Sequence, residues 1–134
     1  MPEYVVPYKG QPDVTRFMER FDLMGGLHHD VKDNRAVFPI IHDGITVDAI
    51  GRSLRNSLPK WKRYGNSGLP FTFGCGKVAV VVEDCVSAAI VGATGNSGCQ
   101  GGDVYVGVAV LGTSLSEGHK AYLSQFSTAV IALD

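Results

Sequence analysis

The pattern of apolar residues along the chain changes its period between residues 27 and 35. Residues 11–27 carry a stripe at helical spacing, and its members are Val14, Phe17, Met18, Phe21 and Met24. Residues three, four and seven apart share one face of a helix, so this segment is predicted to be helical. We expect Asp13 to cap its N-terminus and Gly25–Gly26 to end it.

The next segment is predicted to be a β-hairpin followed by a long loop. Two runs rich in β-formers, "RAVFPI" and "ITVDAIGRSL", flank the Asp43–Gly44 dipeptide, which favours a tight hairpin turn. Residues 55–70 are polar, basic and rich in turn formers. Pro59 and Pro70 argue against a helix there, so we expect a long loop.

The second half has the pattern of an open α/β sheet. "KVAVVVE", "VYVGVAVLG" and "TAVIALD" are apolar runs typical of buried strands, and "DCVSAAIV" and "TSLSEGHKAYLSQF" between them are predicted helices. Ser114 and Glu117 match a capping box for the second helix. We therefore expect a mainly parallel β-α-β-α-β sheet over residues 77–134, preceded by a small α+β subdomain over residues 1–76.

Composition adds limits to this picture. Apolar residues make up 45% of the 134 residues, with a mean hydropathy of +0.09, which favours a packed globular domain. No apolar run is long enough to span a bilayer, and the N-terminus lacks a secretory pattern. Three cysteines without a CxxC pair argue against a disulfide framework or a structural zinc site, so we expect a cytoplasmic protein.

Charge is distributed unevenly between the two halves. Residues 35–77 hold seven basic and two acidic residues, and residues 78–134 hold one basic and five acidic residues. The basic half suits a phosphate-binding surface, and the acidic half suits a cation site. Glu83 and Asp134 each end an apolar strand. If these strands are neighbours, both carboxylates lie at one sheet edge, where Mg²⁺ finds the oxygen ligands that it prefers.

The glycine-rich stretch "VGATGNSG", residues 91–98, has a spacing similar to that of dinucleotide-binding loops. Such a loop follows a strand and opens a helix, whereas here a predicted helix precedes the glycines and a strand follows them. A connection between helix and strand is the better interpretation, and a dinucleotide site stays as an alternative.

Three segments in this order resemble the Toprim domain, the metal-binding module of primases, topoisomerases and some nucleases. They are "VAVVVEDCVSA", "VAVLGTSLSEGHKAYL" and "VIALD". The upstream "NRAVFPI", "IGRSL" and "PKW" resemble the N-terminal subdomain of the catalytic core of bacterial and phage primases. The resemblance covers roughly residues 23–134.

The resemblance implies a phage-type or bacterial primase that makes RNA primers on single-stranded DNA from nucleoside triphosphates, with a replicative helicase as a candidate partner. It implies that Glu83 is catalytic and that Glu83 and Asp134 hold Mg²⁺ or Mn²⁺. Arg35, Arg52 and Lys60 match basic positions of the primase core and are expected to contact phosphates. Neighbouring residues of the basic segment are expected to assist in DNA binding: Arg55, Lys62 and Arg63 by charge and Trp61 by stacking on bases.

This chain also departs from the family pattern. Asp84 stands where Gly usually follows the Glu, Ser87 stands in place of an acid, and the second Asp of Asp-x-Asp would follow Asp134 by two residues. We therefore expect the 134-residue chain to be inactive alone. The alternatives are a Toprim nuclease or topoisomerase-like enzyme, and a non-catalytic nucleic-acid-binding or replisome-assembly module with a degenerate Toprim fold.

Overall fold

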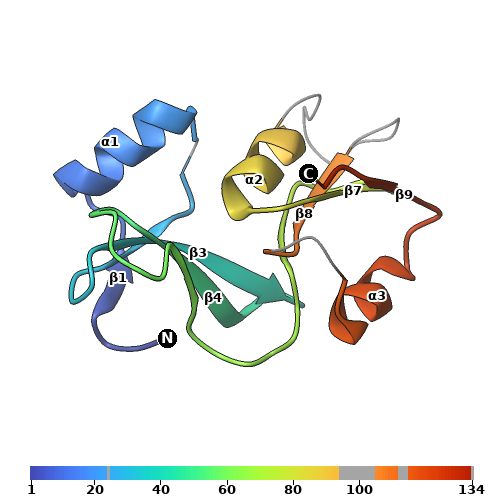
Figure 1. The fold of residues 1–134 in the computed structure, drawn as a ribbon, viewed down its shortest axis with the longest axis horizontal. Helices are drawn as coiled ribbons and strands as arrows, with labels where there is room; N and C mark the ends of the chain where they lie inside the picture. The colour runs from blue at the N-terminus through green and yellow to red at the C-terminus, as the bar shows by residue number, and fades with distance from the viewer. Residues whose placement is uncertain (24, 94–104, 112–114, 134) are drawn as a thin grey trace. The chain divides into compact units, whose positions relative to one another are not determined.

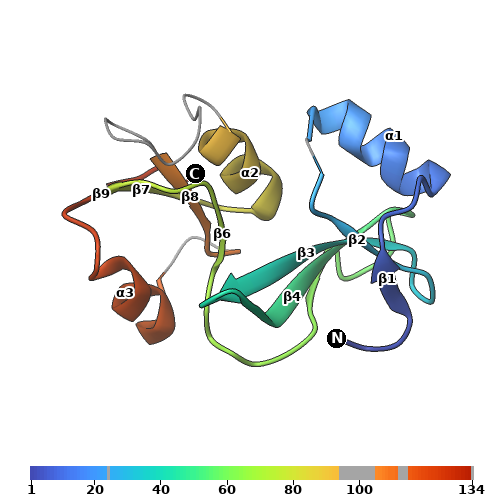
Figure 2. The ribbon, with the colours of Figure 1, turned by 180° about the vertical axis from the view of Figure 1, so that it is seen from behind.

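The computed structural model describes residues 1–23, 25–93, 105–111 and 115–133. The chain divides into two compact units, Met1–Ser67 and Gly68–Asp134, each built around its own sheet (Figures 1 and 2). The strand at residues 71–73 belongs to the second sheet, so the segment before residue 77 contributes to the second unit as well.

The first unit is a five-stranded antiparallel sheet with one helix, in the order β1-β2-β3-β4-β5. Its elements are β1 (Val5–Pro7), α1 (Pro12–Phe21), β2 (His28–Asp30), β3 (Arg35–His42), β4 (Ile45–Ser53) and β5 (Trp61–Arg63). The short β1 and β2 were not expected from the sequence, because three residues are too few to show an alternating pattern.

The predicted hairpin is confirmed as β3 and β4. Asp43 and Gly44 both have positive φ angles, 52° and 77°, as a tight turn between twisted strands requires. Pro39 lies within β3, opposite Ala49 of β4. β2 pairs with β3 only as far as Val37, so the missing N–H of Pro39 lies where β3 has one neighbour instead of two.

Helix α1 covers one face of this sheet (Figure 1). Val14 and Phe17 of the predicted stripe are buried, and the Phe17 ring meets Phe38 edge-on at 6.3 Å between centroids. Both predicted helix ends were wrong. Gln11 is the N-cap, with Pro12 in the first turn, and the helix ends at Phe21, before the glycines, because Asp22 adopts the left-handed conformation.

The opposite face of the sheet holds a second small core. Val5, Val37 and Ala49 are buried together, with Tyr4 and Tyr64 packed against them. The Tyr64 ring lies where a side chain on Gly51 would be, at 2.8 Å from an added Cβ. The Tyr64 hydroxyl donates to the buried carboxylate of Asp30 at 2.5 Å. Burial and this hydrogen bond raise the pKa of Tyr64, so the hydroxyl stays protonated.

The expected long loop over residues 55–70 contains a strand. β5 pairs with β4 at the sheet edge, with Trp61 opposite Arg52 and Arg63 opposite Ile50. The sequence hides this strand because two of its three residues are charged. Charged edge strands are common, since they block pairing with other chains.

The buried Asp48 of β4 fastens the chain that follows β5. Its carboxylate accepts hydrogen bonds from the Gly65 N–H at 2.8 Å, the Ser67 N–H at 3.1 Å and the Ser67 hydroxyl at 2.7 Å. Arg63 completes the site with an ion pair at 2.7 Å. Burial alone would raise the pKa of Asp48, but the hydrogen bonds from Ser67, Ala49 and Arg63 outweigh it, and the pKa is lowered.

The second unit is a four-stranded sheet in the order β6-β8-β7-β9. Its elements are β6 (Phe71–Phe73), β7 (Val78–Val82), α2 (Cys85–Ala93), β8 (Tyr105–Ala109), α3 (Glu117–Leu123) and β9 (Thr128–Ile131). β7, β8 and β9 are parallel, which confirms the predicted β-α-β-α-β order, and β6 is an added antiparallel edge strand. β7 lies between β8 and β9 because the chain crosses back over it after β8.

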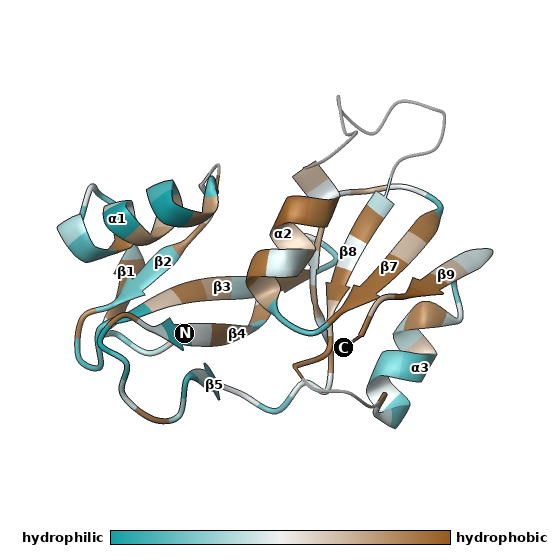
Figure 3. Cartoon of the chain, turned by 45° about the horizontal axis from the view of Figure 1, so that its top comes forward, coloured by the Kyte–Doolittle hydropathy of each residue, from teal (hydrophilic) through white to brown (hydrophobic). Residues whose placement is uncertain are grey.

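Helices α2 and α3 lie on opposite faces of this sheet, and both the strands and α2 are strongly hydrophobic (Figures 1 and 3). Tyr122, Leu123 and Phe126 pack on Ala79, Val106 and Val108. On the other face the backbone of α2 approaches β8 so closely that a Cβ on Gly107 would lie 2.0 Å from the carbonyl oxygen of Ala88. Only glycine fits at this position.

The glycine-rich stretch begins inside a helix. Gly92 belongs to α2, and a Cβ there would lie 2.1 Å from the carbonyl oxygen of Phe73 in β6. This first glycine of "VGATGNSG" therefore serves close packing of the helix on the sheet, and was wrongly placed in the connection. Residues 94–98 lie outside the described residues.

Three further details bear on the sequence-based predictions. The capping box of α3 is formed by Ser116 and His119, and Ser114 lies outside the described residues. Cys75 is disulfide-bonded, although the number and spacing of the cysteines argued against a disulfide framework. Within the described ranges, no helix is both long and apolar enough to cross a bilayer.

Replacing Asp48 tests whether its hydrogen bonds to the chain after β5 stabilise the fold. Because the pKa of Asp48 is lowered in the folded state, its contribution to stability is complete above the ordinary carboxyl pKa of about 4 and is lost as the pH falls below that value. Asp48→Asn is expected to lower the free energy of unfolding by about 1–3 kcal/mol at neutral pH. The same substitution should flatten the loss of stability in acid, measured by denaturant unfolding at several pH values.

Asp43→Asn is the matched control for this experiment. The Asp43 side chain is 87% exposed, and Asn accepts the positive φ of this turn position. Its stability should stay close to that of the wild type at each pH. Equal stability of Asp48→Asn and the wild type at neutral pH would show that the interactions of the Asp48 carboxylate do not stabilise the fold.

A second stability prediction concerns the N-terminal cap of α2, which Asp84 provides. Its Oδ1 accepts the Ser87 N–H at 2.9 Å, three residues on, as an N-cap residue does. Asp84→Ala is expected to cost about 1 kcal/mol of stability, and Asp84→Asn about a few tenths, since Asn also caps helices. Thermal unfolding of the two variants measures the difference, and an equal loss in both would show that charge matters here instead of capping.

Candidate functional site

Glu83 lies at the carboxyl edge of the second sheet. It directly follows β7, the central parallel strand. The backbone hydrogen bonds of β7 with its two neighbours, β8 and β9, continue to the end of the strand. The Val110 N–H donates to the Val82 carbonyl at 3.1 Å, and the Ala132 N–H donates to the Val81 carbonyl at 2.8 Å. The partly exposed Glu83 therefore occupies the edge at which the carboxyl ends of three parallel strands meet, the usual ligand position in such sheets.

The donor chemistry at this edge suits a hard cation, although the described residues supply only part of a site. Glu83 and Asp84 are the carboxylates that follow β7, and Asp84 already gives one oxygen to the cap of α2. Within the described residues, no group of three or more His, Cys, Asp or Glu side chains converges. Asp134, the second predicted ligand, lies outside the described residues.

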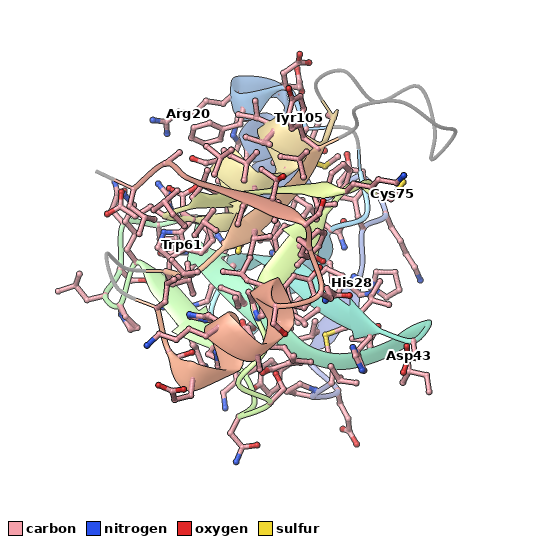
Figure 4. All side chains as sticks on the ribbon, turned by 90° about the vertical axis from the view of Figure 1, so that its right-hand side faces the viewer. Arg20, His28, Asp43, Trp61, Cys75 and Tyr105 are labelled. Carbon is pink, nitrogen blue, oxygen red and sulfur yellow. The ribbon has the colours of Figure 1, made fainter. Side chains whose placement is uncertain are left out.

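In the first unit, two predicted nucleic-acid residues lie together on the face covered by α1. The guanidinium of Arg52 lies 5.3 Å from the centroid of the Trp61 ring and 5.9 Å from that of Phe17. Trp61 also packs on Phe38, at 5.8 Å between centroids, so one part of its ring serves the core. Figure 4 marks Trp61 among the side chains. Its half-buried ring leaves part of its surface open to solvent.

Arg35 and Arg63 are engaged inside the protein. Arg35 is only 1% exposed, pairs with Asp33, and donates to the carbonyls of Gly51 and Lys60 at 3.3 and 3.4 Å. Its guanidinium thus holds β4 and the start of β5 together, and its predicted contact with phosphates stays a prediction. Arg63 is paired with the buried Asp48.

The remaining basic residues lie toward solvent. Arg55 and Lys60 are exposed on the segment between β4 and β5, and Lys62 lies with its ammonium 5.0 Å from the Tyr64 ring centroid. Because side chains alternate along β5, Lys62 belongs to the face opposite Trp61. The structure therefore brings Arg52 and Trp61 together and assigns Lys62 to the other face.

Two arginines of α1 that were not predicted from the sequence join this site. Arg16 and Arg20 line a pocket of about 220 Å³, together with Asp13, Phe17, Arg52 and residues of the segment after β4. Positions 13, 16, 17 and 20 share one helix face, so the spacing is visible in the sequence. The apolar stripe of the same helix is the stronger signal, and it overlaps this face at Phe17. Figure 4 shows Arg20 projecting away from the helix.

Asp13 is the acidic group of this pocket. A hydrogen bond from Asn34 and the nearby charges of Arg16 and Arg55 lower its pKa, although burial opposes them. The Asp13 carboxylate is therefore ionised at neutral pH. The pocket carries three guanidinium groups and one carboxylate, a net charge of +2.

Comparison with known proteins identifies the fold. No protein-family model matches the chain, and no curated protein matches it. A solved structure of the DnaG catalytic core is 19% identical, with a TM-score of 0.50 over 92% of this chain and 42% of that chain. A structure of the DnaG primase catalytic domain bound to ssDNA is also 19% identical, with a TM-score of 0.48 over 91% and 41%.

The chain thus spans about two fifths of the length of these solved proteins. At this identity the likeness concerns the fold alone. It confirms the sequence-based expectation at that level: the mixed α/β chain has the fold of part of a primase catalytic core.

Proposed function

We propose that this chain is part of a DNA primase-like replication protein that makes RNA primers on single-stranded DNA in a metal-dependent reaction. The observation that carries the proposal is the place of Glu83, directly after the central parallel strand of a sheet in a primase-core fold. The Toprim pattern and the relation to phage-type primases belong to the same proposal and rest on the sequence motifs.

In this proposal Glu83 and Asp134 hold Mg²⁺ or Mn²⁺. When bound, the ion would neutralise charge on the phosphates of the incoming nucleoside triphosphate. The Glu83 carboxylate would either help to deprotonate the attacking 3′-hydroxyl or hold the metal ion that acts on this hydroxyl. Asp84 keeps α2 in place beside it through the cap, so the departure from the family pattern has a structural role.

The first unit is proposed to hold the DNA template. Arg52, Arg55 and Lys60 would attract the phosphate backbone, and the exposed part of Trp61 would stack on a base. Arg35 and Arg63 would act as positioning residues, because they hold β4, β5 and the following chain in place. A helicase partner is a further part of the proposal and rests on the family resemblance, and the expected cytoplasmic location rests on the lack of a secretory pattern in the sequence.

Glu83→Gln tests the catalytic proposal. Gln keeps the size and polarity of Glu but cannot accept a proton or supply a charged oxygen ligand. We expect the full-length gene product to incorporate ribonucleotides on a single-stranded template with Mg²⁺ or Mn²⁺, and Glu83→Gln to lose at least about 100-fold in rate, the lower end of a general acid–base contribution. Gel analysis of labelled products measures the change.

Glu117→Gln is the matched control, since the Glu117 side chain is 94% exposed on α3 of the same unit. It should retain the wild-type rate. Undiminished synthesis in Glu83→Gln would exclude the catalytic role. DNA binding without synthesis by the wild type would favour a non-catalytic module.

The salt dependence of DNA binding tests the basic segment. When a variant neutralises one phosphate fewer of a single strand, the slope of log K against log salt decreases by about 0.7. Lys60→Ala is expected to weaken binding at low salt and to reduce the slope by this amount, measured by fluorescence anisotropy with a labelled oligonucleotide. Lys9→Ala removes an exposed lysine from another segment and should leave the slope unchanged. A slope that is the same in both variants would argue against an interaction between Lys60 and a phosphate.

A further inference from the structure

The arginine pocket of the first unit has two walls. One wall is the face of α1 that carries Asp13, Arg16 and Arg20, and the other is the end of β4 with the chain that follows it. Phe17 is buried between the walls and packs on Phe38 of the sheet. The pocket thus lies wholly within one unit and rests on part of its hydrophobic core.

Asn34 joins the two walls. Its side-chain N–H donates to Asp13 Oδ2 at 2.8 Å, and its backbone carbonyl accepts the Leu54 N–H at 3.0 Å. His29 bonds the remaining side-chain oxygen of Asn34 at 2.8 Å, which fixes the orientation of the amide. Asn34 itself is only 5% exposed, so a buried amide ties α1 to the chain that follows β4.

The second wall is itself preformed. The Ser53 hydroxyl accepts the N–H groups of Arg55 and Ser57, at 3.2 and 3.0 Å, and shares a hydrogen bond with the Ser57 hydroxyl. These bonds close residues 53–57 into a compact turn. The pocket therefore does not have to be assembled when a ligand arrives, and little ordering cost is added to binding.

The three guanidinium groups are oriented by different neighbours. Arg16 is paired with Asp13, Arg20 lies over the Phe21 ring at 4.8 Å, and Arg52 lies near the rings of both Phe17 and Trp61. A planar guanidinium that packs against an aromatic ring still directs its N–H groups outward. Such groups bind phosphate oxygens in pairs, which an ammonium group cannot do.

We propose that this pocket binds the terminal phosphate group of a nucleotide or of a 5′-phosphorylated strand. The phosphate chemistry follows from the arginines, and the choice of a nucleic-acid carrier rests on the proposed function. A terminal phosphate carries about 1.5 to 2 negative charges at pH 7, which balances the net charge of +2 of the pocket. A backbone phosphodiester carries one charge and leaves the pocket positive.

The size of the pocket agrees with this occupant. Sites for complete drug-sized ligands occupy about 300–1,000 Å³, whereas this pocket occupies about 220 Å³. A phosphate group fits inside, and the nucleoside attached to it would remain outside.

The first experiment uses inorganic phosphate and pyrophosphate as probes. We expect titration of the full chain to shift the NMR signals of the Nε–H groups of Arg16, Arg20 and Arg52 in a saturable way. Arg20→Gln should weaken binding by at least about tenfold, as expected when one charge-assisted hydrogen bond is removed. Arg20→Lys keeps the charge but not the paired N–H groups, so it should bind with intermediate strength.

Lys32→Gln is the matched control. It removes one exposed positive charge of the first unit outside the pocket, where Lys32 lies over the Tyr4 ring. Phosphate affinity should be unchanged. No saturable shift at the three arginines, or an equal decrease of affinity in Lys32→Gln and Arg20→Gln, would overturn the proposal.

The second experiment identifies the carrier. Oligonucleotides of one sequence, with and without a 5′-phosphate, are compared with ATP by fluorescence anisotropy and competition. Tighter binding of the 5′-phosphorylated strand, or competition by ATP, that is abolished in Arg20→Gln supports the proposal and tells the two carriers apart. Equal binding of both strands together with no competition by ATP that depends on Arg20 would refute the terminal-phosphate site and leave the proposed function standing. Phosphate binding without binding of either carrier would overturn the proposed occupant, and a wild type that binds neither strand at all would also count against the proposed function.

Discussion

The arrangement of the first unit depends on one buried carboxylate. Asp48 is enclosed in β4 and must be satisfied by hydrogen bonds, because an unpaired charge in that place would be very costly. In the described part of the chain, its donors come from residues 49 and 63–67. The hydrogen bonds to Asp48 therefore hold the chain after β5 against the sheet. A polar, glycine-rich segment thereby adopts one conformation.

Buried polar groups that must be hydrogen-bonded also link the core of the first unit to Arg52 and Trp61, the candidate nucleic-acid-binding residues. Asp30 accepts a hydrogen bond from the Tyr64 hydroxyl, Arg35 donates to backbone carbonyls, and Asn34 links α1 to the end of β4. These buried polar groups hold together the elements that carry Arg52 and Trp61. Two arginines of the same basic segment thus have different roles. Arg35 is buried and holds neighbouring strands together, and Arg52 lines the arginine pocket.

In the second unit, close packing decides the position of the candidate catalytic group. The absence of side chains at Gly107 and Gly92 lets α2 lie directly on β8 and β6. Asp84 then caps the helix, and Glu83 is left between strand and cap. An added methyl group at Gly107 would displace the helix and, with it, the loop that presents Glu83. The position of Glu83 therefore depends on how closely α2 packs on the sheet.

The sequence by itself determined the strong periodic elements: the helix stripe around Phe17, the β3–β4 hairpin with its Asp43–Gly44 turn, and the parallel β7–β8–β9 core. These patterns are local, so they can be recognised without knowledge of partners. Only the tertiary structure decided that Arg35 is buried, that β5 is a strand, and that Arg16 and Arg20 line one pocket with Arg52. Each of these depends on which residues the fold brings together across the sheet, and a polar side chain carries no local sign of its partner.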